Sequence, residues 1–405
     1  MSTIEPLLRD EILSELNFLR SIGTKIFLYP FIERSKLQIV GYAVTYVLVV
    51  CTTVQLFITI FSSNSMDWLE MINVVPNLGV CAMTVIKYTK LQTHKVLYND
   101  VYLHFQDEMW DIISPHSEIH RKIVIKYKRV AMYINRFLLY YSIPLIIVVD
   151  SFPYIMMKYV EKYHDLKEYL YPFDGWYPFD KIKFYGAAYV WESYMTVVVV
   201  CVYVYSNMIH ASWIAFTCME LRILGNCLEE LLSPEDVVDI KRGVNVDEIH
   251  LRATRKLKFI ISRHEFLAKS KQTLDAVLGD AMLLNYSLGA IFICLTAFTS
   301  TIVTNLYKRV RYFFMCLSLL VEVFNQCLLG QIISDHSENV TDSIYSSNWL
   351  DASPETKKVM LMFMVRTQKP FELTGNGYII MNMSTFSRIC STSYQFFNLL
   401  ITIYY

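Results

Sequence analysis

The stretch L-Q-I-V-G-Y-A-V-T-Y-V-L-V-V-C-T-T-V-Q-L-F-I-T-I-F occupies residues Leu37–Phe61 and contains no charged side chain. An α-helix needs about 20 apolar residues to cross the hydrocarbon core of a bilayer. Inside that core the backbone has no water to bond to, so a single spanning segment has to be helical. The stretch therefore predicts a transmembrane helix.

Six further runs of the chain have a comparable length and composition. They are Leu69–Lys87, Val130–Met157, Phe184–Phe216, Ala276–Asn305, Arg311–Ser334 and the C-terminal Met381–Tyr405. We expect Pro144 to bend the third of the seven helices, because proline removes a backbone donor. The sequence thus predicts an all-α membrane protein with seven transmembrane helices.

The overall composition agrees with a chain whose solvent is largely lipid. Of the 405 residues 54% are apolar and 18% are charged, whereas a soluble domain is about a quarter charged. Formal net charge is zero, so nothing favours nucleic acid as a partner. The nine cysteines form no C-x-x-C pair, and most lie in apolar runs, as small buried hydrophobes do.

The distribution of Lys and Arg predicts the orientation in the membrane. With the N-terminus inside, the cytoplasmic pieces 1–36, 88–129, 216–275 and 334–370 carry 26 of these residues, and the outer loops 62–68, 157–183 and 304–311 carry 8. The inner pieces are also longer, which accounts for part of the bias. We expect a cytoplasmic N-terminus and an external C-terminus.

The long inner segments predict a second, cytoplasmic layer of helices. We divide the chain into an amphipathic N-terminal segment (1–36), helices one to four with an outer aromatic loop at 157–183 (37–215), cytoplasmic anchor helices (216–275), helices five and six (276–334), a cytoplasmic loop with an anchor helix (335–380) and helix seven (381–405). Glu355–Pro370 is an amphipathic stretch within the last loop. Helices four to seven are therefore expected to extend into an anchor bundle below the membrane.

No enzyme motif is found in the chain. It contains no G-x-S-x-G, no phosphate-binding loop and no H-E-x-x-H, so we expect neither an enzyme nor a cofactor or metal site. Ionisable residues inside a membrane are often functional. Glu192 and Glu322 lie deepest, in the outer halves of their helices, where we expect them to pair with hydroxyl groups or to face a water-filled cavity.

Aromatic residues mark the outer side of the chain. The loop Tyr169–Asp180 reads Y-L-Y-P-F-D-G-W-Y-P-F-D, which predicts a compact lid over the helix ends. Beneath it, the outer halves of helices two, three, four and six supply aliphatic and aromatic side chains. We predict a ligand site formed by Val75, Leu78, Tyr141, Leu145, Ile146, Tyr189, Met195, Met315 and Leu319. A small dry pocket of this kind suits a volatile organic molecule; the alternative is that these residues only pack helices together.

Two C-terminal stretches resemble insect odorant receptors. C-L-L-G-Q-I-I-S-D-H-S-E-N-V-T-D-S-I-Y-S-S-N-W (Cys327–Trp349) is similar to the end of the sixth helix and the following inner loop of that family. R-T-Q-K-P-F-E-L-T-G-N-G-Y-I-I-M-N-M-S-T-F-S-R-I-C-S-T-S-Y-Q-F-F-N-L-L (Arg366–Leu400) is similar to its last helix. The outer run Pro172–Pro178 also resembles many members. The chain lacks the long inner-loop insertion of the co-receptor, so it resembles a ligand-tuning subunit.

The resemblance implies a function and several site residues. Such receptors are tetrameric, odorant-gated, non-selective cation channels of olfactory neuron dendrites, usually assembled with the co-receptor. Their seventh helices line one shared pore, whose apolar gate falls here on Phe397 and Ile401 with Leu400 beside them. Tyr345, Trp349 and Tyr394 are the implied subunit contacts. The strongly apolar end of helix seven, mixed with Ser, Thr and Asn, is compatible with such a pore.

Two other classes of membrane protein fit the sequence less well. A G-protein-coupled receptor also has seven helices, but the chain has no D-R-Y after helix three, no N-P-x-x-Y in helix seven and the reverse charge bias. A secondary transporter is expected to show related halves and broken helices, and neither is evident.

Overall fold

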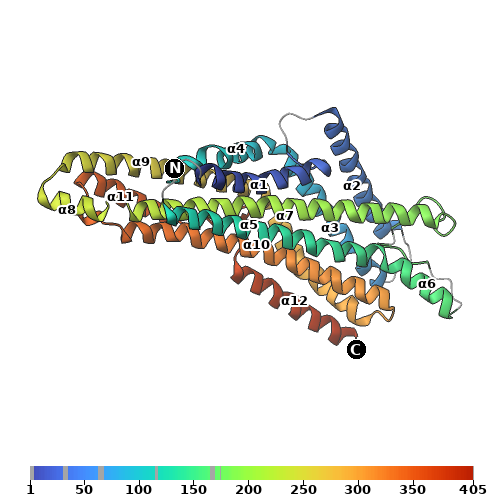
Figure 1. Ribbon diagram of the computed structural model, residues 1–405. Coiled ribbons are helices and arrows are strands. Elements are labelled where there is room, and N and C mark those ends of the chain that lie inside the picture. The colour runs from blue at the N-terminus through green and yellow to red at the C-terminus, as the bar shows by residue number, and fades with distance from the viewer. Residues whose placement is uncertain are drawn as a thin grey trace.

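The computed structural model describes residues 4–30, 35–62, 68–114, 117–164, 169–173 and 175–404. In these ranges it is almost entirely helical, and its longest helices run side by side to give an elongated molecule (Figure 1). The seven predicted spans correspond to α2 (Lys36–Ser62), α3 (Trp68–Thr93), α5 (Glu118–Asp150), α7 (Tyr185–Glu229), α9 (Val246–Ile302), α10 (Leu306–Ser346) and α12 (Met383–Tyr404).

Five helical stretches are long and apolar enough to cross a membrane on length and composition alone. They are α2, α5 with α6 (Phe152–His164), α7, α9 and α10. The two remaining spans are more polar, since α3 carries Lys87 and Lys90 while α12 carries a series of Ser and Thr residues. Polar groups in a membrane need either partners within the protein or access to water.

The third span differs from the expectation at its proline. The helix continues through Pro144 and ends at Asp150, and a new helix, α6, begins at Phe152. Ser151 separates the two. The break within the predicted span Val130–Met157 thus lies at Ser151, seven residues beyond Pro144. A proline leaves the rest of a membrane helix intact where neighbouring groups satisfy the freed carbonyl, and the bend at Pro144 stays a prediction.

Helices α7, α9 and α10 continue well beyond the length of a bilayer. With 45, 57 and 41 residues at 1.5 Å per residue they are about 60 to 85 Å long. Their extensions form a second bundle, completed by α1 (Ile4–Lys25), α4 (Lys95–Gln106), η1 (Glu108–Ile112), α8 (Pro234–Arg242), η2 (Trp349–Asp351) and α11 (Pro354–Thr367) (Figure 1). We call this second bundle the distal bundle; it occupies the position predicted for the anchor.

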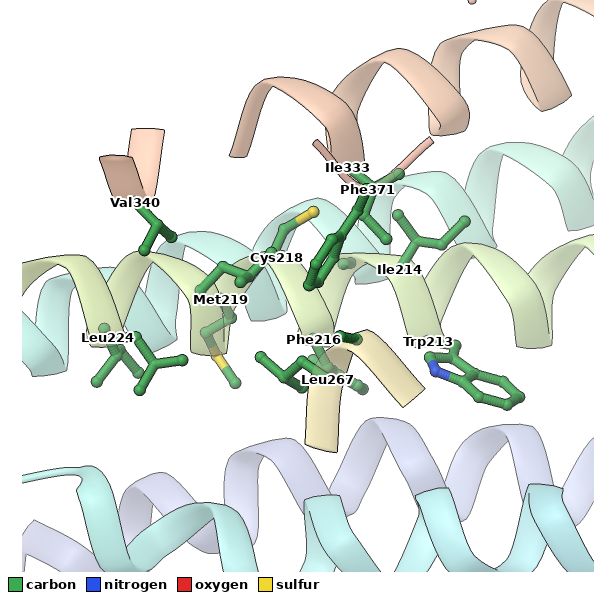
Figure 2. Packing of buried hydrophobic residues seen from close by; sticks show 14 of the residues in the cluster. Trp213, Ile214, Phe216, Cys218, Met219, Leu224, Leu267, Ile333, Val340 and Phe371 are labelled. Carbon is green, nitrogen blue, oxygen red and sulfur yellow. The ribbon is translucent and has the colours of Figure 1, made fainter. Parts of the chain in front are cut away.

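The largest hydrophobic core fills the distal bundle and extends along α9 and α10 into the fifth and sixth spans. Figure 2 shows Phe216, Met219 and Leu224 of α7 at its centre, with Leu267 of α9 and Val340 of α10 packed against them. Phe216, Met219 and Leu224 are fully buried. Packing on all sides is what fixes the relative positions of the three long helices.

A short connection leads from the distal bundle to α12. Strands β1 (Thr374–Gly375) and β2 (Ile379–Ile380) pair as an antiparallel hairpin between α11 and α12. Asp275 of α9 accepts hydrogen bonds from the backbone nitrogen and the hydroxyl of Thr374, at 2.8 and 3.1 Å. The seventh span is thus joined to the anchor through this hairpin, whereas spans four to six continue into it as unbroken helices.

Candidate functional site

A cavity of about 130 Å³ lies among α2, α3, α5, α7 and α10, beneath the aromatic loop. Its walls are mostly apolar. They are formed by Thr52, Leu56, Asn77, Val80, Cys81, Leu145, Val149, Pro172, Phe173, Met195, Thr196, Val199, Val200, Arg311, Met315 and Ser318. We call it the upper cavity. Its volume is close to that of an engineered apolar cavity of about 150 Å³ that binds benzene.

A second cavity of about 100 Å³ adjoins the first on the side of the distal bundle. We call it the lower cavity. It shares Val80, Leu145, Val199, Val200 and Ser318 with the upper cavity, and it is also lined by Leu138, Tyr141, Ser142, Tyr203, Val204, Asn207, Leu319, Val321 and Glu322. The shared residues are a thin wall of aliphatic side chains and one hydroxyl.

The lower cavity ends on a buried ion pair. Lys87 Nζ of α3 lies 2.7 Å from Glu322 Oε1 of α10, and both side chains are less than a tenth exposed. Asn207 of α7 donates to the same carboxylate and accepts from Lys87, and Gln326 donates to it at 2.9 Å. Buried charges are stable only when paired and hydrogen-bonded. This floor cluster therefore joins three helices in the middle of the protein.

The aromatic loop is held over the upper cavity by Glu192 of α7, which is completely buried. Its carboxylate accepts hydrogen bonds from the backbone nitrogens of Phe173 and Gly175, at 2.8 and 3.0 Å, and from the Tyr177 hydroxyl at 3.2 Å. The loop backbone would otherwise leave these donors unsatisfied away from water. Glu192 thus folds the loop inwards, so that Phe173 forms part of the cavity roof.

Helices on both sides of the loop fix its other end. The Trp176 backbone nitrogen donates to the Thr59 hydroxyl of α2 at 2.8 Å, and Gln55 of α2 donates to the Trp176 carbonyl at 3.0 Å. Tyr307 of α10 donates to the Tyr171 carbonyl at 3.0 Å. The loop is consequently a roof bonded to α2, α7 and α10, as the predicted lid requires.

The structure brings five of the nine predicted ligand residues to these two cavities. Leu145, Met195 and Met315 line the upper one, and Tyr141, Leu145 and Leu319 line the lower one. Val75, Leu78, Ile146 and Tyr189 line neither. Leu78 packs in the cluster around Met195, and the Tyr189 hydroxyl bonds the Asp150 carbonyl. For these four residues the prediction that they touch a ligand is not supported by the geometry.

Several lining residues were missed by the sequence analysis. Phe173 comes from the aromatic loop, and Thr52 and Leu56 come from α2, which was not counted among the contributing helices. The two acidic side chains, Glu192 and Glu322, were recognised from the sequence, because each is a charge within an apolar run. Their partners were not: Lys87 sits at the end of the predicted second span, where a lysine usually reaches the interface. Within the described ranges no group of three or more His, Cys, Asp or Glu could hold a metal.

The orientation of α12 differs from the one implied by the resemblance. Phe397, Leu400 and Ile401 are half-buried on the side that continues Ile389 and Ser393 towards the subunit's own helices. A residue lining a pore shared between subunits has to face away from its own bundle. The outward face carries Ser384, Ser387, Ser391, Gln395, Asn398 and Thr402 and the exposed apolar Leu399 and Ile403. The predicted gate residues are thus less exposed than this outward face, and their role as the gate stays a prediction.

Two of the three predicted subunit contacts are exposed in the isolated chain. Tyr345 is 72% and Tyr394 is 64% exposed, which leaves both free to meet another chain. Trp349 is instead half-buried and packs on the distal core of its own subunit. The sequence analysis missed an exposed apolar patch beside it, on α11, formed by Leu361, Met362 and Val365.

Comparison with known proteins agrees with this geometry. The family described as 7tm Odorant receptor matches residues 67–394. The chain belongs to this family. Putative odorant receptor 92a of Drosophila melanogaster is 23% identical over 83% of this chain and 80% of that receptor. Odorant receptor 67a of the same organism is 29% identical, over 37% of each chain, so this alignment spans little more than a third of the relative.

The fold of the receptor is also known from solved structures. The insect olfactory receptor OR5 from Machilis hrabei, in complex with eugenol, matches with a TM-score of 0.80 over 97% of this chain and all of the other, at 13% identity. A second structure of OR5 from Machilis hrabei also matches with a TM-score of 0.80, at 15% identity. The seven-helix fold of insect odorant receptors is therefore the fold of this chain. The chain is a multi-pass membrane protein, and the G-protein-coupled alternative is not favoured.

Proposed function

We propose that the chain is an odorant-tuning subunit of a ligand-gated, non-selective cation channel. The observation that carries this proposal is the pair of adjoining apolar cavities enclosed by α3, α5, α7 and α10 under a bonded aromatic roof. Sites that are dry, small and poor in polar groups suit small organic ligands. The similar Machilis hrabei receptor was solved with eugenol, which supports a volatile organic molecule as the ligand.

The ligand contacts we propose are the lining residues of the two cavities. Of the residues predicted from sequence, these are Tyr141, Leu145, Met195, Met315 and Leu319. A ligand shifts a conformational equilibrium only by binding one state more tightly than the other. The site spans several helices that continue towards α12, so a ligand that favours one arrangement of α3, α7 and α10 changes the support on which α12 rests.

We propose that α12 lines the shared pore with its outward face. Its polar stripe, Ser384, Ser391, Gln395, Asn398 and Thr402, provides a face that water can wet. Leu399 and Ile403 are four residues apart and are 54% and 73% exposed, so they share one side of the helix. A ring of such side chains around an axis closes a pore by expelling water. This moves the gate from Phe397, Leu400 and Ile401 to the outward side.

Assembly and location complete the proposal. The exposed apolar residues Leu361, Met362 and Val365 of α11, together with Tyr345, form a surface for contact with neighbouring subunits, among them the co-receptor, since apolar cores are typical of permanent interfaces. Tyr394 borders the pore face of α12. We place the distal bundle in the cytoplasm, because it contains most of the Lys and Arg residues, and the receptor in the plasma membrane of olfactory neuron dendrites.

The test compares the two faces of α12 in cells that express the chain with the co-receptor at a known ratio. Leu399→Ser and Ile403→Ser should wet the closing ring and raise the current that flows without odorant. Ile401→Ser is the matched control, because Ile401 is the same kind of side chain, lies two residues from both Leu399 and Ile403, and is half-buried. A rise with Ile401→Ser alone would restore the register expected from sequence. No odorant-evoked current in any chain, with both subunits at the surface, would refute the channel function.

A further inference from the structure

The lower cavity contains one buried polar group that the protein does not satisfy. The Tyr141 hydroxyl is inaccessible to solvent and has no hydrogen-bond partner among the described residues. Its ring is held in place by a stacked contact with Phe137, with centroids 6.1 Å apart and planes within 16°. An unpaired hydroxyl in an apolar site costs free energy comparable to a lost hydrogen bond. A ligand atom that accepts a hydrogen bond would remove this cost.

Three other polar side chains of the lower cavity are already engaged in hydrogen bonds within the protein. The Ser142 and Ser318 hydroxyls donate to the carbonyls of Leu139 and Met315, at 2.7 and 2.8 Å. Asn207 uses both ends of its amide on the floor cluster. Of the polar side chains that line this cavity, Tyr141 is the one whose hydroxyl is buried without a hydrogen-bond partner among the described residues.

The charge on the floor is compensated. Glu322 is paired with Lys87 at 2.7 Å and accepts from Gln326 as well. A charged ligand entering here would be desolvated without gaining an unpaired opposite charge, which is unfavourable by several kcal/mol. The site thus selects against both ammonium and carboxylate ligands.

We infer that the lower cavity binds neutral molecules with one hydrogen-bond-accepting oxygen, such as a ketone, ester or ether, placed at the Tyr141 hydroxyl. The apolar part of the molecule then lies against Leu145, Val199 and Val200, the wall shared with the upper cavity. Tyr141 is on this account a specificity-determining residue. The inference rests on the proposed ligand site and adds the chemical class of ligand that the site prefers.

The test uses two probes that differ in one group. The first probe is the ketone 2-pentanone. The second is the alkene 2-methyl-1-pentene, in which a methylidene group of similar shape replaces the carbonyl oxygen. The alkene leaves water more readily, so the order of the two affinities is not informative. The informative quantity is how the ratio of the two affinities changes in Tyr141→Phe, which removes only the hydroxyl. Tyr140→Phe is the matched control, because Tyr140 is the neighbouring residue of α5 and is 64% exposed.

Affinities are measured on the purified full-length chain, from the dependence of its thermal unfolding midpoint on probe concentration. In Tyr141→Phe the preference for the ketone over the alkene should fall by about three- to tenfold relative to wild type, the effect of one neutral hydrogen bond. Tyr140→Phe should retain the wild-type ratio. Pentylamine, protonated at pH 7, and pentanoate should give no shift of the midpoint.

Several outcomes would overturn the inference. They are an unchanged ratio in Tyr141→Phe, an equal change in Tyr140→Phe, binding of either charged probe with the affinity of the ketone, or no binding of either neutral probe to the wild type. Odorant-evoked current in co-receptor-expressing cells is recorded separately. Binding with the expected ratio but without current would refute the proposed channel function and leave the ligand class standing.

Discussion

The two halves of α7 are packed in different ways. In the distal bundle, every residue from His210 to Leu228 except Arg222 is buried. In the outer half, burial recurs only at every third or fourth residue, at Ala188, Glu192, Met195 and Val199. The same helix is therefore surrounded on all sides at one end and supported on one face at the other.

This difference separates two requirements on one helix. All-round packing transmits a change in position, because close-packed interiors have no space in which to absorb it. The outer half, with two cavities and one face available to lipid, can accept a ligand without unfolding. We expect mutations in the distal bundle to act mainly on folding and mutations around the cavities to act mainly on ligand response.

The floor cluster should be the exception to that division, and the largest effect is expected there. Glu322→Leu leaves Lys87 buried without its counter-charge, and the loss of one partner of a buried pair costs about 3–5 kcal/mol. The expected result is a low yield of folded receptor, measured as the fraction that elutes as a single species after detergent extraction. Although the cluster lies outside the distal bundle, its loss should be as damaging as a lesion of the distal core.

The double change Lys87→Met with Glu322→Leu is the control. It removes both charges and keeps apolar volume, so folded yield should recover, since replacing a buried pair by apolar residues is often tolerated. A yield of Glu322→Leu equal to that of wild type would mean that Lys87 reaches water in the membrane, and it would weaken the argument for a neutral floor.

A matched pair of methionines tests the comparison directly. Met219 lies in the distal core and Met195 lines the upper cavity, and both are completely buried on α7. Truncation of a buried methionine to alanine costs about 2–5 kcal/mol, depending on how far the surroundings collapse. The loss of unfolding free energy in Met219→Ala should lie in the upper part of this range. This substitution should therefore lower the thermal unfolding midpoint more than Met195→Ala does.

Met195→Ala should instead move the odorant dose–response, because it enlarges a cavity that already exists. Ion selectivity of the current should remain that of wild type, since Met195 is remote from α12. Equal thermal effects of the two truncations, with an unchanged dose–response in Met195→Ala, would contradict the separation of folding and ligand binding along α7.

The smallest expected effect is a dependence of the distal bundle on pH. His264 of α9 lies between the rings of Phe363 and Phe371, at centroid distances of 5.1 and 5.2 Å. Burial, together with the charge of Arg366, lowers the pKa of His264 to about 4. The folded bundle therefore holds the imidazole neutral, whereas the unfolded chain takes up a proton near pH 6.5.

Acid should therefore destabilise the distal bundle. The folded-state pKa is depressed, so the stabilising contribution is complete above about pH 6.5 and is lost as the pH falls towards 4. At pH 5 the loss is about 2 kcal/mol, seen as a lower unfolding midpoint than at pH 7. His264→Phe should reduce this drop. A drop of the same size in His264→Phe would assign the pH dependence to other groups.

The spans could be predicted from the sequence because length and hydrophobicity are enough to define them. The lining of the cavities could be predicted only in part. In lipid both faces of a helix are apolar, so hydrophobic periodicity does not distinguish the inward side from the outward side; Leu145 and Ile146 are adjacent and equally apolar, yet only Leu145 reaches a cavity. The same ambiguity applies to α12, where Phe397, Leu400 and Ile401, the gate residues predicted from sequence, are half-buried while Leu399 and Ile403 are exposed.

Charged residues were more informative than apolar ones, but the sequence identified only the residues themselves and not their partners. Glu192 and Glu322 were recognisable as unusual, because a charge within a span needs a reason. Their partners could not be found, since the Phe173 backbone nitrogen and Lys87 are brought to them by packing between segments 19 and 235 residues apart. Contacts of that range are set by the three-dimensional arrangement, which no local pattern encodes.

Gly330 of α10 has a consequence for how the receptor can vary in evolution. A β-carbon at this position would overlap with the carbonyl oxygen of Met381, two residues before α12 begins. Even alanine would have to push that carbonyl aside. The cavity walls can therefore vary, because their side chains can be exchanged for others of similar size, whereas Gly330, packed against the segment that leads into α12, has room for a hydrogen atom and nothing larger.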